Sequence, residues 1–66
     1  MNIKLNGEPR EIDDGTTVGQ LLDTLVQDRR GIAVAVDGEV VRRATWDTTD
    51  MYDGARVEIL SAVQGG

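Results

Sequence analysis

The group best suited to chemistry in this 66-residue chain is the carboxylate of Gly66, at the end of a Gly65-Gly66 pair. An average glycine usage of about 7% makes two glycines at two given positions a roughly 0.5% coincidence. Glycine has no Cβ, so such a backbone can enter another protein's active site through a narrow opening. Transfer of AMP from ATP would activate the carboxylate, and a sulfur nucleophile that displaced AMP would leave a thiocarboxylate. Gly66 is therefore the predicted sulfur-carrying residue.

The rest of the chain offers little covalent chemistry. It contains no cysteine and no histidine, which excludes thiol nucleophiles, thiolate metal sites and the commonest acid–base residue near neutral pH. Ser61 is the only serine, and no histidine can activate it. We therefore predict a carrier that enzymes act upon rather than an enzyme, with no catalytic residues, no metal site and no bound cofactor.

Size and charge restrict the partners. A domain of this size buries only about 60% of the surface of its unfolded chain, which leaves little room for a deep pocket. Twelve acidic and seven basic residues give a net charge of −5, which disfavours nucleic acid and anionic membranes. No apolar run approaches the roughly 20 residues of a membrane span, and the start lacks a signal-peptide pattern. We expect a cytoplasmic protein that is a monomer when free.

The hydrophobic pattern predicts five strands around one helix. The helix is expected near Val18–Arg29, started by a capping box of Thr17 and Gln20 and ended by basic residues and Gly31. Its apolar face would pack on a sheet. That face consists of Val18, Leu21, Leu22, Leu25 and Val26. The strands are expected at Asn2–Asn6, Arg10–Asp13, Ile32–Val36, Glu39–Val41 and Ala55–Leu60.

The connections follow from turn residues. Gly7-Glu8-Pro9 predicts the first turn, and Asp37-Gly38 predicts a two-residue hairpin in which Val36 opposes Glu39. The segment from Ala44 to Tyr52 is expected to cross as a loop with one short helical turn. Trp46 and Tyr52 in that segment would close the edge of the core. The predicted fold is α+β, with a domain at 1–60 and a flexible tail at 61–66.

Several segments together resemble the thiamine-biosynthesis sulfur-carrier family, which has the ubiquitin-like β-grasp fold. The resemblance covers nearly the whole chain. It rests on Ile3–Gly7, Gly15–Leu22, Ala33–Val41, Arg43 with Trp46, Asp53–Leu60 and Val63–Gly66. One departure is Arg42, where many members of the family have proline, and we expect it to change the local turn.

The resemblance implies a mechanism. A ubiquitin-activating-type adenylyltransferase would use ATP and Mg²⁺ to adenylate Gly66, and a sulfurtransferase or other sulfur source would convert the adenylate to a thiocarboxylate. Thiazole synthase would then take the sulfur to build the thiazole ring of thiamine. The residues Gly65, Gln64 and Val63 would be recognised as the tail.

A docking patch is expected on the sheet face that the helix leaves open. It would lie beside the base of the tail. Its members are Leu60, Ala62, Ala33, Ala35 and Val40.

Other functions fit the same fold and tail. The chain could carry sulfur for molybdopterin, cysteine or tRNA thiolation, although such carriers are commonly longer. It could instead modify proteins by joining Gly66 to lysines, which would give conjugates of higher mass. A non-covalent adaptor would keep its activity without Gly65 and Gly66.

Overall fold

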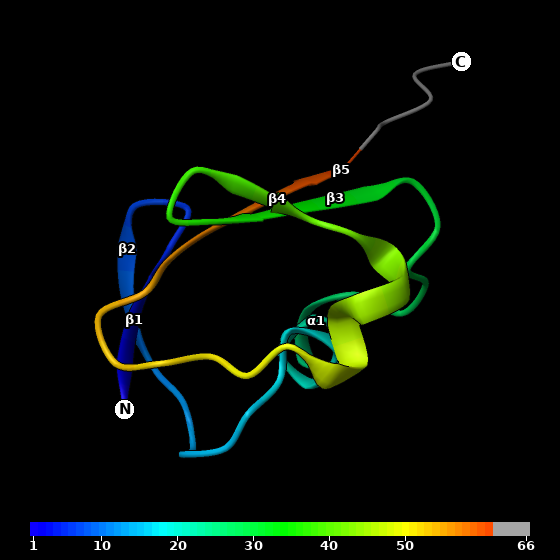
Figure 1. The fold of residues 1–66 in the computed structure, drawn as a ribbon. Coiled ribbons are helices and arrows are strands. Elements are labelled where there is room, and N and C mark those ends of the chain that lie inside the picture. The colour runs from blue at the N-terminus through cyan, green and yellow to red at the C-terminus, as the bar shows by residue number, and fades with distance from the viewer. Residues whose placement is uncertain (62–66) are drawn as a thin grey trace.

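The computed structural model describes residues 1–61, which form one mixed sheet with helices on one side (Figure 1). The five strands lie in the order β2-β1-β5-β3-β4. Strands β1 and β5 are parallel, and the other neighbours are antiparallel. The strand bounds are β1 Asn2–Leu5, β2 Glu8–Glu11, β3 Ile32–Val36, β4 Glu39–Val41 and β5 Arg56–Ser61. This arrangement confirms the predicted α+β fold with a mixed sheet.

Helix α1 (Val18–Leu25) begins as predicted and ends earlier. Thr17 Oγ1 accepts the Gln20 N–H at 3.1 Å, and Gln20 Oε1 accepts the Thr17 N–H at 3.0 Å. At Val26 the backbone turns extended, with φ −132° and ψ 150°, so the prediction of a helix to Arg29 was wrong. The last turn contains no basic residue. Leaving the helix early lets Val26 pack partly buried against the core.

Arg29 explains the segment after α1. Its guanidinium reaches back to the helix, donating to both carboxylate oxygens of Asp23 at 3.0 Å and to the Gly19 carbonyl at 3.2 Å. It also donates to both oxygens of Asp47, at 3.0 and 3.3 Å. A continuous helix would place Arg29 about 15 Å along the axis from Gly19. The chain folds back here because these interactions replace the predicted last turn.

The first hairpin turns at Asn6-Gly7, not at the predicted Gly7-Glu8-Pro9. Both central residues have positive φ, 51° at Asn6 and 86° at Gly7, as type I′ turns require. Leu5 therefore pairs with Glu8, and Pro9 lies inside β2 opposite Lys4. Because β2 is an edge strand, the missing N–H of proline interrupts no ladder.

The second hairpin confirms the predicted register. Val36 pairs with Glu39 and Val34 with Val41 around Asp37-Gly38. Val34 is buried, and Val36 and Val41 pack partly buried against the core. The opposite face of this hairpin stays open to solvent.

The segment after β4 contains the short 3-10 helix η1 (Arg43–Thr48), which is the helical part expected in this crossing segment, although it starts one residue earlier and is longer than a single turn. Trp46 is fully inside the core, where its Nε1–H donates to the Val41 carbonyl at 2.9 Å. Tyr52 is about half exposed (49%), so its predicted place at the core edge was wrong. Helices α1 and η1 together cover one face of the sheet (Figure 1). Within residues 1–61, no helix is long and apolar enough to cross a membrane.

Candidate functional site

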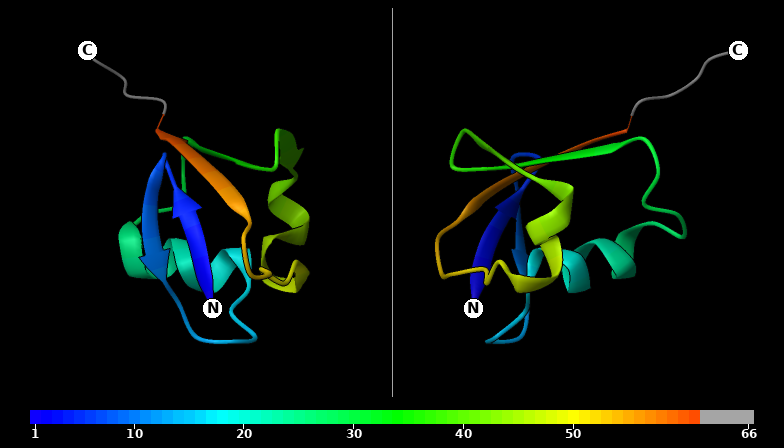
Figure 2. Two further views of the ribbon diagram at one scale, coloured as in Figure 1. Left: turned by 90° about the vertical axis from the view of Figure 1, so that its left-hand side faces the viewer. Right: turned by 45° about the vertical axis from the view of Figure 1, so that its right-hand side comes forward.

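Strand β5 leads directly to the predicted tail and lies in the centre of the sheet. Its last three residues, Ile59–Ser61, are called the tail root below. Ile59 pairs with Val34, Leu60 with Ala33 and Ser61 with Ile32. Ser61, where the tail was expected to begin, is thus the last residue of the strand. The tail root and the start of β1 lie at opposite ends of the molecule (Figure 2).

Asn6, which directly follows β1, holds the tail root on the side opposite to β3. Its Oδ1 accepts the Ile59 N–H at 2.9 Å, and its Nδ2 donates to the Ile59 carbonyl at 3.3 Å. Backbone pairing of β1 with β5 ends nearby, where the Asn6 N–H donates to the Val57 carbonyl at 2.8 Å. The side-chain amide therefore extends the β1–β5 pairing by one further residue. Sequence reasoning missed Asn6, although the Asn6-Gly7 pair was a hairpin signal.

The residues predicted to do the chemistry lie outside the described residues. They are Val63, Gln64, Gly65 and Gly66, together with Ala62 of the docking patch. Their roles therefore remain predictions. The structure defines the strand end from which they follow.

Four members of the docking patch meet on the open face of the sheet. Leu60 lies beside Ala33 and Val40 beside Ala35, because those residues are cross-strand partners. Leu60 is 68% exposed and Val40 is 76% exposed, so both large side chains face solvent. Ala33 and Ala35 lie between these two side chains, and their small size leaves the surface shallow there. The predicted patch is therefore assembled by the fold, and its binding role remains a prediction.

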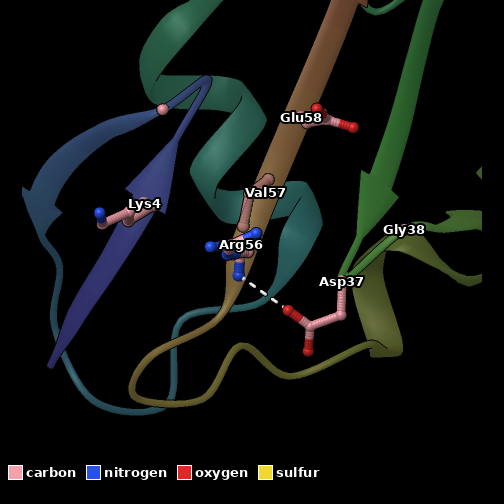
Figure 3. A pocket seen from close by; sticks show the side chains of 7 residues that line it. Lys4, Asp37, Gly38, Arg56, Val57 and Glu58 are labelled. Carbon is pink, nitrogen blue, oxygen red and sulfur yellow. Dashed lines mark hydrogen bonds between the residues drawn. The ribbon is translucent and has the colours of Figure 1, made fainter.

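A separate pocket of about 540 Å³ lies near the two hairpin turns (Figure 3). Its charged lining mixes both signs, with Lys4 and Arg56 beside Asp37 and Glu58. Asp37 Oδ1 accepts the Arg56 N–H at 3.0 Å (Figure 3). The pocket includes no residue of the tail root. Within residues 1–61, no three His, Cys, Asp or Glu side chains are grouped to hold a metal ion.

Ion pairs link exposed and partly exposed side chains on the helical side of the molecule. The hydrogen bonds from Arg29 lower the pKa of Asp23, and those bonds to Asp23 and Asp47 raise the pKa of Arg29. Arg30 lies 2.7 Å from Asp28 and lowers the pKa of that carboxyl in the same way. All of these side chains are at least partly exposed, so each pair adds little stability by itself. None of them belongs to the tail root.

Comparisons with known proteins agree with this arrangement. The model of the ThiS family matches residues 3–66. The sulfur carrier protein ThiS of Escherichia coli is 30% identical over 66 residues, which cover both chains completely. The crystal structure of the thiamine biosynthesis protein ThiS from Geobacter metallireducens has a TM-score of 0.84 and 36% identity, again with full coverage of both chains.

A longer relative also matches. A thiazole synthase of Paramagnetospirillum magneticum is 33% identical over all 66 residues of this chain. The chain spans only 20% of that relative's length. In that protein a stretch similar to this chain is part of the same polypeptide as the synthase.

Proposed function

The chain belongs to the ThiS family of thiamine-biosynthesis sulfur carriers, and from that premise we propose that it carries sulfur as a thiocarboxylate on Gly66. The observation that carries the proposal is the position of β5. The strand that precedes Gly66 is held on both sides by β1 and β3, so the tail starts from a fixed point. The sequence contains no cysteine that could hold sulfur instead.

The proposed reaction has two steps. A carboxylate oxygen of Gly66 attacks the α-phosphorus of ATP, pyrophosphate leaves, and an acyl adenylate forms. A nucleophile at the oxidation level of sulfide then attacks the acyl carbon, and AMP leaves with the C–O bond electrons. The product is a thiocarboxylate. When its sulfur is later transferred, the acceptor gives up one oxygen to the acyl carbon in exchange, and this restores the carboxylate. The carrier supplies the reacting terminus, and its partners supply the catalytic groups.

The proposed partners follow from these steps. An adenylyltransferase of the ubiquitin-activating type binds ATP and Mg²⁺ and uses them to adenylate Gly66. A sulfurtransferase or other source supplies the sulfur. Thiazole synthase is the proposed acceptor enzyme. The similarity of this chain to a fifth of one thiazole synthase supports that choice. In that relative, a domain of this kind is covalently kept near the enzyme that would use it.

The docking patch is proposed as the surface that these enzymes hold while the tail reacts. Leu60 belongs both to the patch and to the tail root, so a partner bound there lies next to the base of the tail. Large exposed aliphatic side chains among small ones suit burial in a shallow apolar surface. Ala62 is proposed to extend the patch along the tail.

The direct test is the intact mass of the protein after incubation with the adenylyltransferase, MgATP and a sulfur source. The expected gain is about 16 Da, the difference between sulfur and oxygen. The control is the same chain without Gly66, which should gain no mass. An unchanged mass of the full chain, or transfer of the chain to lysines of other proteins in higher-mass conjugates, would overturn the proposal.

A further inference from the structure

Charge is distributed unevenly over this acidic protein. Four aspartates of the chain lie close to the starts of β1 and α1, and Figure 2 shows these starts at the end of the molecule away from the tail root. Asp14 lies 3.4 Å from the N-terminal amino group, and Asp53 accepts the Asn2 N–H at 2.8 Å. The backbone of Asp50 forms an isolated antiparallel β-bridge with that of Thr17. Asp13 directly precedes Asp14 in the loop that connects β2 to α1.

The basic residues are placed differently. Four of the seven lie just before β3 or just after β4, namely Arg29, Arg30, Arg42 and Arg43. Arg29 and Arg30 have carboxylate partners. Arg42 and Arg43 are exposed and take part in no ion pair within residues 1–61. Arg43 nevertheless acts on Asp28, whose pKa it helps to lower, so Arg42 is the arginine of this group that has no carboxylate close to it within residues 1–61.

Arg42 lies in line with Leu60. Its backbone is extended, with φ −69° and ψ 140°, and it directly follows Val41 of β4. Continuing the β3–β4 register by one residue places Arg42 opposite Ala33, which is the partner of Leu60. Strand alternation directs its side chain to the same open face as Val40. Two strand spacings, about 10 Å, separate the Arg42 backbone from that of Leu60.

The neighbouring structure fixes both arginines in position. The Arg42 carbonyl accepts the Thr45 N–H and the Thr45 hydroxyl, each at 2.9 Å. The Arg43 guanidinium lies 5.6 Å from the ring centre of buried Trp46, within the range of a cation–π interaction. Both backbones are therefore held where η1 begins, but the Arg43 side chain lies against Trp46, and only Arg42 is directed to the open face of the sheet.

We propose that Arg42 adds a positive charge to the docking surface and binds a carboxylate on the partner protein while the tail is held. This inference rests on the proposed function, since the partner is the enzyme that acts on Gly66. Guanidinium groups bind carboxylates through two parallel hydrogen bonds. Such charges chiefly accelerate and orient association, so the tail end would meet the partner first.

A matched pair of substitutions tests the proposal. Arg42→Glu reverses a charge directly after edge strand β4, and Arg10→Glu makes the same net change on edge strand β2 at the other side of the sheet. The measurement is the association rate with the adenylyltransferase at low and high salt. Arg42→Glu should slow association about 10-fold at 0.01 M salt, where the Debye length is about 30 Å, and far less at 1 M. Equal slowing by the two variants would show that only net charge matters and would overturn the proposal.

A second measurement does not depend on adenylation. Unlabelled hexaglutamate is titrated into the isotope-labelled protein, and backbone amide shifts are recorded. Shifts should concentrate at Arg42, Arg43 and the tail root, and Arg42→Glu should abolish them. No shifts at these amides, or stronger binding of a short single-stranded oligonucleotide, would overturn the proposal. If the wild type is never adenylated, the proposed function fails, and this titration still decides whether the surface binds carboxylates.

Discussion

The side-chain amide of Asn6 clamps the backbone of Ile59, accepting its N–H at 2.9 Å and donating to its carbonyl at 3.3 Å. The two residues are 53 positions apart in the chain, and the contact joins the first turn to the last strand. The turn of the first hairpin thus supports the strand that leads to the tail.

Asn6→Gly should remove this clamp without straining the turn, because glycine readily adopts the φ of 51° found there. We expect a loss of about 1 kcal/mol in the free energy of unfolding, measured by chemical denaturation. Amide hydrogen exchange of Ile59 should also become faster.

Asp37→Gly is the matched control for Asn6→Gly. Asp37 has a φ of 52° in the other hairpin turn, and its carboxylate likewise accepts a β5 amide, that of Arg56. This variant should lose similar stability with little local change at Ile59. Equal acceleration of Ile59 exchange in both variants would contradict a local clamp.

Leu60→Asp should weaken binding to the adenylyltransferase by about 10-fold or more, equivalent to about 1.4 kcal/mol, while the fold is kept. The side chain is 68% exposed, so the substitution buries no charge in the free protein. Calorimetric titration measures the affinity, and thermal unfolding checks the fold.

Tyr52→Asp provides the comparison for Leu60→Asp. Tyr52 is 49% exposed and lies outside the sheet, so it tests loss of an exposed apolar group elsewhere. Its affinity should match that of the wild type. If Leu60→Asp binds the adenylyltransferase with the affinity of the wild type, the docking patch is not the surface that this enzyme recognises.

Gly19 and Asp47 should be coupled energetically. A Cβ built on Gly19 would overlap the Asp47 carboxylate and would lie 2.9 Å from Nη2 of Arg29, the flexible side chain that binds that carboxylate. Alanine normally stabilises a helix interior relative to glycine by about 1 kcal/mol. We expect Gly19→Ala to give that gain only when Asp47→Ala is already present.

A double-mutant cycle by urea denaturation measures this coupling. The expected interaction energy between the two sites is about 1 kcal/mol. The same change in stability for Gly19→Ala in both backgrounds would show that Asp47 moves aside without cost.

Acid should destabilise the fold through Asp23 and Asp28. Their hydrogen bonds from Arg29 and Arg30 lower both pKa values below the ordinary 3.8, so the folded state binds protons less readily than the unfolded state. Their contribution is complete above that value and is lost as the pH falls through the lowered pKa. The melting temperature should therefore fall below about pH 4. A smaller fall in Asp23→Asn would confirm the assignment, and an identical fall would refute it for that residue.

Sequence patterns predicted the elements whose signals are local. The Asp37-Gly38 hairpin, the alternation of Val57 and Ile59, and the capping box of Thr17 all appear as expected. Each depends on neighbours within a few residues. Four docking-patch residues also followed from alternation, because strand register determines which side chains share a face.

The errors occurred where distant residues decide the structure. The end of α1 depends on Arg29, which binds Asp47 across the chain, and no helix-end pattern records that contact. The predicted position of the first turn was wrong because proline is typical of turns. Pro9 instead lies in an edge strand, where proline is tolerated. Asn6 escaped notice as a support for the tail root because its partner, Ile59, belongs to the last strand.

The parallel pairing of β1 and β5 has a mechanical consequence. A pull that separates Met1 from Ser61 along the strands loads their hydrogen bonds together, including Lys4 N–H to Ala55 O at 2.9 Å. Bonds loaded in shear must break at once, whereas the β3–β4 hairpin could be peeled one bond at a time. A partner that pulls on Ser61 while the start of the chain is held would therefore meet several hydrogen bonds at once, and this arrangement favours a domain that stays folded under such a pull.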